Sequence, residues 1–217
     1  MLPEVYPEDR RRNYNAIVSL SDDGSITAQV RITDFGIRAL SSDRWRQRTT
    51  VEDQVEYLTE RFAKSMLNIM IYDYDFGRDD DSAWVTFGLS GSDYISKSGE
   101  FNLVKADFFH PDEKGSLTKK KGRVHDVWFG KPRLYETTIY WNLPEGWSVS
   151  DGLDSSAGEC DIAHASSDLS YQDGKLRFYS VITYDGGLVP VESYKQARKF
   201  DRKVSAIKAT KMFISKQ

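Results

Sequence analysis

The chain has 217 residues, a formal net charge of −3, one cysteine and three histidines. This length can bury one sizeable hydrophobic core or two small ones. Hydrophobic residues make up 39% of the chain and aromatic residues 13%, which excludes a disordered protein. A single cysteine excludes an internal disulfide framework and a multi-cysteine zinc site. The near-neutral charge argues against a general nucleic-acid or membrane-surface binder.

The N-terminal sequence resembles neither a membrane anchor nor a signal peptide. The longest apolar runs of the chain are a few residues, whereas a helix needs about 20 to span a bilayer. The segment 1–7 has no apolar core and precedes Arg10, Arg11 and Arg12, which is unlike a secretory leader. We therefore expect either a cytoplasmic protein or a piece of a longer chain.

The first predicted element is a β-hairpin. Apolar residues occupy every second position of segment 26–33, the period of a half-buried strand. Segment 14–20 is its predicted partner. The residues between the two strands favour a turn, because Gly24 can adopt positive φ.

A predicted amphipathic helix comes next. Its apolar residues recur three or four positions apart and so share one face: Val51, Val55, Leu58, Phe62 and Met66. Thr49 and Glu52 have the spacing of a capping box, and Thr50 is an alternative N-cap.

The remaining sequence predicts short strands, one long loop and a second helix. Strand patterns cover 67–72, 83–89, 99–108, 133–141 and 176–184, and a last strand is expected at 212–214. The second helix follows Pro190, and its predicted buried face consists of Tyr194, Ala197, Phe200, Val204 and Ile207. The fold class is therefore α+β, predominantly antiparallel β in sandwich-like sheets, with two amphipathic helices packed on the sheet. The loop 110–122 divides the chain into predicted subdomains 1–122 and 123–217, unless it decorates one continuous domain.

The lone thiol is the first candidate for chemistry. Cys160 and His164 are four residues apart, a spacing that would bring them together on a helix. The local sequence predicts a strand or loop instead, which separates the two Cα atoms by roughly 13 Å. We therefore interpret Cys160 as structural and His164 as incidental. His110 and His125 share no regular spacing with a carboxylate and are expected to be surface or satisfied histidines.

An acidic segment from Asp73 to Asp81 could bind calcium, because carboxylates at alternate positions can converge on a hard cation. It does not fit an EF-hand loop, since Gly77 falls at the fifth position and Trp84 stands in place of the bidentate Glu. A solvated hairpin loop is the favoured interpretation, and calcium binding stays open. No cofactor is expected.

The C-terminal segment is basic. Residues 190–217 carry eight Lys or Arg and two acidic residues, a local charge of +6 that leaves −9 on the remainder. The segment is a candidate docking surface for an acidic partner, and its alternative is a solvated helix face whose basic side chains cover apolar neighbours. The candidate docking residues are Lys195, Arg198, Lys199, Arg202 and Lys203.

Five tryptophans suggest a carbohydrate- or surface-binding β-sandwich as an alternative function. Most of them lie within apolar alternation, which predicts the core. Trp128 and Trp147 lie beside loop residues and are the candidates for stacking on a glycan.

Several short motifs resemble one protein family when taken in order. The run from Phe129 to Trp147, which contains the sequence LPEG, is similar to a region of large bacterial transglutaminase-like proteins downstream of their catalytic core. The run from Leu188 to Phe200 is similar to that family's closing helix. The Asp23-Gly24-Ser25 turn and segment 36–39 also resemble the region downstream of the core, so the likeness extends from about Tyr14 to the end.

The resemblance implies a non-catalytic accessory or interaction module whose upstream catalytic core is not in this chain. Transglutaminase-like catalysis needs a cysteine at a helix N-terminus with a following histidine and aspartate, and Cys160 does not match that position. The implied partners are proteins, either the upstream core or another protein. A glycan is the alternative partner that the aromatic residues suggest, and the charge and the short apolar runs predict neither nucleic-acid binding nor a membrane span. The implied location is extracytoplasmic, at the periplasm or cell surface, as part of a longer exported chain.

Overall fold

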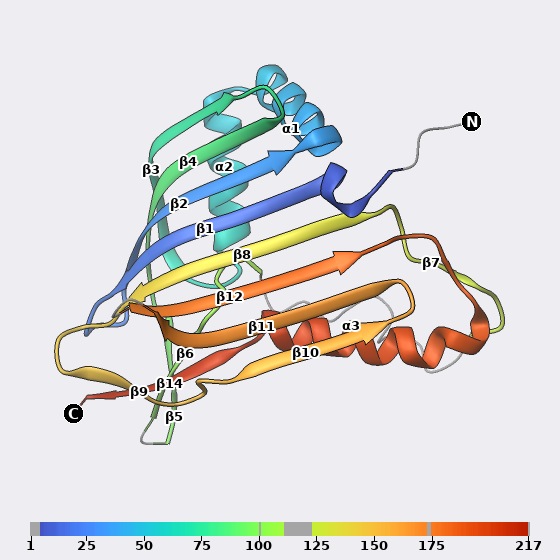
Figure 1. The fold of residues 1–217 in the computed structure, drawn as a ribbon. Helices are drawn as coiled ribbons and strands as arrows, with labels where there is room; N and C mark the ends of the chain where they lie inside the picture. The colour runs from blue at the N-terminus through green and yellow to red at the C-terminus, as the bar shows by residue number, and fades with distance from the viewer. Residues whose placement is uncertain (1–4, 100, 111–122, 173–174, 217) are drawn as a thin grey trace.

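The structure, a computed structural model, describes residues 5–99, 101–110, 123–172 and 175–216. An eight-stranded sheet forms its largest element (Figure 1), with the strand order β10-β11-β12-β8-β1-β2-β4-β3. Neighbouring strands are antiparallel except β1 and β8, which run parallel. In that order the strands are Ser155–Cys160, Ala163–Gln172, Lys175–Tyr184, Arg133–Asn142, Arg11–Leu20, Ile26–Phe35, Ser82–Ser92 and Leu67–Arg78.

Two smaller sheets make up the rest of the β structure in the described residues. One has the order β5-β6-β14-β9, with strands Ile95–Ser98, Phe101–Lys105, Lys211–Lys216 and Trp147–Asp151. The other pairs β7 (Val127–Trp128) with β13 (Leu188–Val189). Strand β14 therefore brings the C-terminal end of the chain against strands from its middle.

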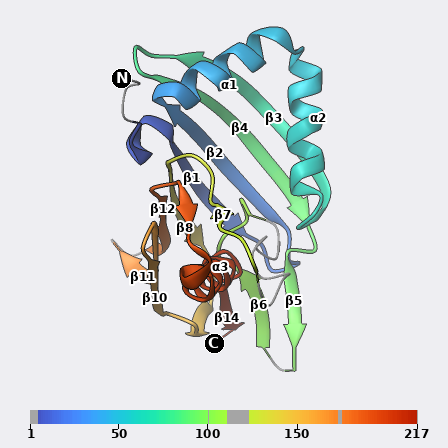
Figure 2. The same ribbon diagram turned by 90° about the vertical axis from the view of Figure 1, so that its right-hand side faces the viewer.

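Three helices lie on one side of the large sheet (Figure 2). They are α1 (Gly36–Arg48), α2 (Val51–Phe62) and α3 (Tyr194–Lys208), and the 3-10 turns η1 (Pro7–Arg10) and η3 (Val191–Ser193) precede β1 and α3. Helices α1 and α2 cover the half of the sheet built from β1 to β4, and α3 covers the half that contains β10 and β11. None of the described helices lies on the opposite face of the large sheet. This arrangement confirms the predicted class, α+β with β structure dominant.

The main core lies between the large sheet, α2 and the small four-stranded sheet. Alternate residues of β1 and β2 enter it, as the period-2 pattern predicted, and Gly24 in the turn has φ +83°. Its largest fully buried side chains include Trp141, Phe62, Phe87, Phe108 and Phe109. The Trp141 indole donates its N–H to the Ala106 carbonyl at 3.1 Å, so the polar atom of this buried ring is satisfied.

A second core lies under α3. It joins β11 and β12 to the helix through Ala163, Ala165, Ile182, Phe200, Val204 and Ile207. All five residues that the periodicity assigned to the buried face of this helix are buried.

Helix α2 differs in detail from its prediction. It ends at Phe62, so Met66 follows the helix although it is buried, and Val51 at the first turn is 46% exposed. The N-cap is Thr50, whose hydroxyl oxygen accepts the Asp53 backbone N–H at 3.1 Å. The buried face instead includes Gln54, a polar residue that the apolar pattern could not assign.

Helix α1 was not predicted. Its only two buried residues are Ala39 and Arg46, so the apolar stripe by which amphipathic helices are recognised is absent. The side of α1 that faces the sheet is largely polar, and its residues Arg38, Ser42 and Arg46 line a cavity.

The large sheet takes strands from both predicted subdomains, because β1 and β8 pair along nine residues. Most of the predicted dividing loop, residues 111–122, lies outside the described residues.

None of the described helices is both long and apolar enough to span a membrane.

The chain turns directly from β2 into α1 at Gly36, which has φ +55° and donates its backbone N–H to the Asp81 carbonyl. A Cβ at Gly36 would lie 2.5 Å from the Asp9 carbonyl oxygen. We expect Gly36→Ala to destabilise the fold by at least about 2 kcal/mol, since strained φ and a backbone clash add. Gly146→Ala is the matched control, because Gly146 has φ +75° but open space around it, and it should cost about 1 kcal/mol. Urea unfolding measures both, and equal losses would contradict the proposed clash.

Candidate functional site

One buried carboxylate organises the polar side of α1. Asp34 is fully buried at the end of β2, directly opposite Arg12 of β1 in the strand register. Arg12 binds it with both prongs of its guanidinium, Nε to Oδ1 at 2.5 Å and Nη2 to Oδ2 at 2.6 Å. Arg38 lies four residues along the chain and adds a contact of 2.8 Å, and the Ser42 hydroxyl donates to the same carboxylate. Asp34 thus joins β1, β2 and α1.

The charges around Asp34 keep it ionised. Burial alone would raise the pKa of Asp34, but the hydrogen bonds and charge of Arg12, together with Ser42 and Arg38, outweigh burial and lower that pKa below its ordinary value. Burial likewise opposes the Arg12 cation, and the hydrogen bonds and charge of Asp34, with a contribution from Tyr14, raise the pKa of Arg12 above its ordinary value.

A cavity of about 430 Å³ opens between α1, α2 and the sheet, and we call it the helical cavity. Its walls carry four guanidinium groups, from Arg12, Arg38, Arg46 and Arg61. Its other lining residues are Ser41, Ser42, Gln54, Tyr74, Trp45, Tyr57, Ile32, Leu58 and Val85. The volume lies within the range of small-molecule sites, about 300–1,000 Å³.

Arg46 is the unusual member of this cavity. The residue is only 6% exposed, and its Nη1 is buried with no hydrogen-bond partner among the described residues. Burial lowers the pKa of Arg46, although the Asp34 charge acts in the opposite direction. Its backbone carbonyl is held by the side-chain amide of the buried Gln54 at 3.0 Å. A buried cationic donor without a partner is costly, so its presence in a cavity wall needs a reason.

A second cavity of about 330 Å³, which we call the central cavity, adjoins the first because both are lined by Arg12, Arg38 and Arg61. Arg133 and Lys208 add two cations, from β8 and from the last residue of α3. The remaining lining residues are Tyr14, Tyr135, Tyr184 and His110. We call the two cavities together the arginine cleft.

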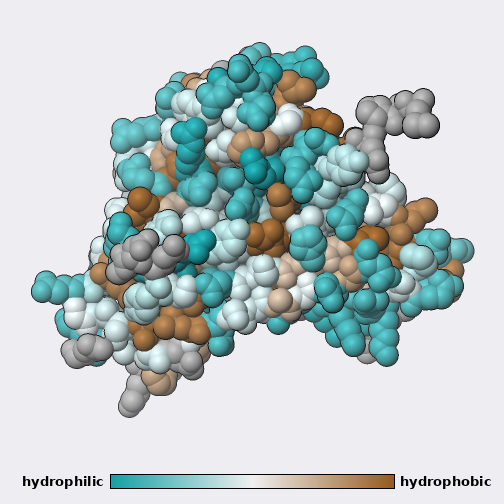
Figure 3. All heavy atoms as spheres, viewed as in Figure 1, coloured by the Kyte–Doolittle hydropathy of each residue, from teal (hydrophilic) through white to brown (hydrophobic). Residues whose placement is uncertain are grey.

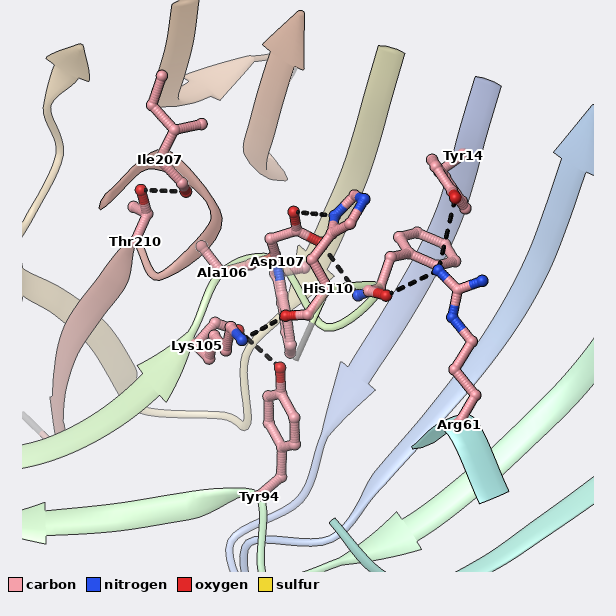
Figure 4. A network of polar contacts seen from close by, with 11 residues as sticks. Tyr14, Arg61, Tyr94, Lys105, Ala106, Asp107, His110, Ile207 and Thr210 are labelled. Carbon is pink, nitrogen blue, oxygen red and sulfur yellow. Dashed lines mark hydrogen bonds and ion pairs between the residues drawn. The ribbon is translucent and has the colours of Figure 1, made fainter. Parts of the chain in front are cut away.

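Figure 4 shows how polar contacts hold one wall of the central cavity. Arg61 of α2 donates from Nη2 to the Phe109 carbonyl at 3.0 Å and to the Tyr14 hydroxyl at 3.4 Å. His110 is paired through Nδ1 with the buried Asp107 at 2.7 Å, and its carbonyl accepts from the Lys105 ammonium. The expectation for His110 was a surface or satisfied histidine; it is paired, and it also lines the cavity.

The pKa values of two tyrosines in the central cavity respond to the charges of the neighbouring arginines. Burial opposes ionisation of Tyr14, but the charges and hydrogen bonds of Arg12 and Arg61 outweigh it and lower the pKa of Tyr14 below its ordinary value. On the other side of the central cavity, burial raises the pKa of Tyr184 to about 12 against the opposing charge of Arg133. Arg12 and Arg61 therefore favour negative charge at the Tyr14 hydroxyl.

The lining of the arginine cleft is strongly unbalanced in charge. Six cations line it, namely Arg12, Arg38, Arg46, Arg61, Arg133 and Lys208, and no Asp or Glu is among the described residues on its walls. The buried Asp34 behind the wall offsets one positive charge. A cleft of this kind in a chain of net charge −3 concentrates positive potential in one place, which attracts anions.

The open face of the large sheet carries a different surface. A shallow hollow of about 400 Å³ lies there, lined by Asn15, Ala16, Ile17, Gln29, Val30, Arg31, Thr86, Thr138 and Tyr140. Figure 3 shows this face as a mixture of hydrophilic and hydrophobic surface without one extended apolar patch. It combines one cation with neutral side chains and therefore lacks the charge concentration of the arginine cleft.

The predicted docking residues lie on α3, away from the arginine cleft. Lys195, Lys199 and Arg202 are exposed, whereas Arg198 and Lys203 are half-buried. The stem of Lys203 lies on Gly158 of β10, where an added Cβ would come within 2.7 Å of it. Lys203 therefore covers part of the sheet with its aliphatic stem, and docking of an acidic partner on this face stays a prediction.

The structure does not bring the two candidate stacking residues together. Trp128 in β7 is 63% exposed. Trp147 in β9 is half-buried against the main core, and its indole N–H donates to Asp22 in the β1–β2 turn. Strands β7 and β9 lie at opposite ends of the molecule in Figure 1, so the two rings cannot share one sugar.

Cys160 and His164 lie on neighbouring strands of a hairpin, β10 and β11, and not along one strand. The expected separation of roughly 13 Å was therefore wrong, because the chain reverses direction between the two residues. The strand partners are Cys160 with Ala163 and Glu159 with His164. Burial raises the pKa of the half-buried Cys160 thiol above its ordinary value, the opposite of what a nucleophile requires. His125 is exposed.

The acidic segment forms the end of β3 and the turn into β4, with all five aspartates exposed. Within the described part of the chain, no three His, Cys, Asp or Glu side chains are close enough together to hold a metal ion.

One sequence pattern could have indicated part of the arginine cleft. Asp34, Arg38, Ser42 and Arg46 follow one another at intervals of four, the spacing of one helix face. A search for apolar periodicity passes over this series because its members are polar. Arg12, Arg61 and Arg133 join it only through the fold.

No protein-family model matches the chain, and no curated protein shows significant similarity to it. The resemblance to transglutaminase-like proteins therefore stays a prediction.

Asp34→Asn tests the role of the buried carboxylate. It leaves Arg12 and Arg38 without their anion, so we expect a loss of about 3–5 kcal/mol in the free energy of unfolding at neutral pH. The folded-state pKa of Asp34 is depressed, so its contribution is complete above the pKa of an unfolded aspartate, about 3.9, and is lost as pH falls through the folded-state value. The gap between the wild type and Asp34→Asn should therefore narrow in acid.

The matched control for this experiment is Asp43→Asn on the same helix. Asp43 forms a surface pair with Arg78 at 3.3 Å and should contribute less than about 1 kcal/mol. Denaturant unfolding across a pH series measures both variants. A gap for Asp34→Asn that stays constant from pH 7 to the acid limit would contradict the assignment.

Proposed function

We propose that this chain is a non-catalytic binding module whose arginine cleft takes an anionic ligand. The observation that carries the proposal is Nη1 of Arg46, a buried cationic donor in the wall of a cavity that has no partner among the described residues. An oxyanion bound there would supply the missing acceptor, and guanidinium groups match carboxylate and phosphate oxygens in a planar, two-pronged geometry.

Two features support binding over covalent catalysis. The Cys160 thiol has a raised pKa and lies in a β-hairpin, so it is suited to neither nucleophilic nor redox chemistry. The His110–Asp107 pair is tied into the wall by contacts on both residues, since the Asp107 carboxylate also accepts the Phe109 backbone N–H at 3.0 Å. The pair fixes the orientation of the imidazole in the wall of the cavity.

The resemblance in sequence supplies the setting of the proposal. A binding module suits an accessory region of an exported transglutaminase-like protein, where it would hold a ligand or partner for a catalytic core encoded upstream. In that setting the module lies outside the cytoplasm, and the basic face of α3 is a second surface, able to dock an acidic protein partner.

Replacement of Arg46 tests the proposal. Arg46→Met should weaken binding of inorganic phosphate about tenfold or more, measured by isothermal titration calorimetry at low ionic strength, because a charged hydrogen bond is lost. The same variant should keep or raise the Tm, since it removes a buried cation with an unsatisfied donor. Arg48→Met, an exposed arginine on the same helix, is the control and should change neither quantity. Absence of phosphate binding in the wild type, or a large fall in Tm for Arg46→Met, would defeat the proposal.

Carbohydrate binding is the second candidate function, and the exposure of Trp128 favours it. Trp128 is 63% exposed and pairs across the β7–β13 ladder with Leu188, which is 59% exposed. If this patch binds a sugar face, glycan-array binding of the wild type should be lost in Trp128→Ala and kept in Trp147→Phe. Equal glycan binding by the wild type and Trp128→Ala would remove this candidate.

A further inference from the structure

The helical cavity has two chemically different parts. One part is formed by the guanidinium groups of Arg12, Arg38, Arg46 and Arg61. The other is an apolar floor of Ile32, Leu58 and Val85, which belong to β2, α2 and β4 and are each no more than 6% exposed. A small inorganic anion would contact the arginines and make little use of this apolar floor.

Two aromatic residues line the same cavity and remain substantially exposed. Trp45 of α1 is 41% exposed and Tyr57 of α2 is 52% exposed, and their rings meet edge to face with centroids 5.5 Å apart. Large aromatic side chains left partly in water at a cavity are typical of sites that bind a ring or an apolar group. Both residues lie on the same two helices that carry Arg38, Arg46 and Arg61.

The charge of the cavity indicates which charged group its ligand carries. Four guanidinium groups face one carboxylate, Asp34, which leaves a formal surplus of three positive charges. Asp34 binds two nitrogens of Arg12 and one nitrogen of Arg38. Arg46 and Arg61 form no direct contact with Asp34 among those described, so their charges are the more available to a ligand. A doubly charged oxyanion matches this surplus better than a single carboxylate does.

We infer that the ligand of the helical cavity joins a doubly charged oxyanion to an aromatic group, the chemistry of an aryl phosphate monoester. This inference rests on the proposed function and specifies its ligand class. The oxyanion contacts the guanidinium groups and accepts a hydrogen bond from the unpartnered Nη1 of Arg46. The aromatic ring lies on the apolar floor beside Trp45 and Tyr57.

Calorimetric titration with three probes tests the inference. Phenyl phosphate should bind about tenfold or more tightly than inorganic phosphate, because the ring buries apolar surface that the bare ion cannot. Benzoate has the same ring with one charge and should bind more weakly than phenyl phosphate. The double variant Trp45→Ala, Tyr57→Ala should bring the preference for phenyl phosphate over phosphate close to one. Tyr171→Ala, an exposed aromatic residue of β11 outside the cleft, is the control and should keep that preference.

The outcomes separate the inference from the proposed function. Phosphate binding without tighter binding of phenyl phosphate would overturn the aromatic part and leave the anion site standing. Equal affinity for benzoate and phenyl phosphate would overturn the doubly charged head group. If none of the three probes binds, the anion site itself is wrong and the inference falls with it.

Discussion

A single buried carboxylate determines how the helical side of this protein is built. Asp34 binds Arg12 across the β1–β2 ladder and binds Arg38 and Ser42 from the following helix, so it fixes α1 against the end of the sheet. A buried ion cluster of this kind is a weak source of net stability but a strong constraint on geometry, because a misplaced partner leaves a charge unpaired. The orientation of α1 then sets Arg46 and Trp45 into the cavity shared with α2.

The cluster also explains why the cleft carries surplus charge. One carboxylate cannot neutralise the arginines gathered around it, and the fold adds Arg61 from α2, Arg133 from β8 and Lys208 from α3 to the same region. A protein that needed only a stable core could replace Arg46 by an apolar residue of similar volume without loss. The presence of a buried, unsatisfied donor at Arg46 is explained if an anion completes the cavity, because the residue then contributes to binding at a cost in stability.

Much of the fold could be predicted from the sequence, because most elements bury apolar residues at a regular period. The β1–β2 hairpin and the five buried residues of α3 follow from such patterns. Helix α1 could not be found this way, since its inward face is Arg38, Ser42 and Arg46. The carboxylate that offsets their charge, Asp34, lies in the preceding strand β2. The candidate site was missed because its residues come from all three described helices and from strands far apart in the sequence. The parallel pairing of β1 with β8 brings Arg12 and Arg133 into the same region. The stacking candidates failed to converge because β7 and β9 belong to different sheets.

The most direct test of the anion site is a crystal structure of the protein grown with phenyl phosphate. An anion site in the helical cavity predicts difference density for the ligand there, with a phosphate oxygen about 3 Å from Nη1 of Arg46. It would be contradicted by a cavity without ligand density in which Nη1 of Arg46 is hydrogen-bonded to a protein side chain, or by ligand bound instead to the basic face of α3.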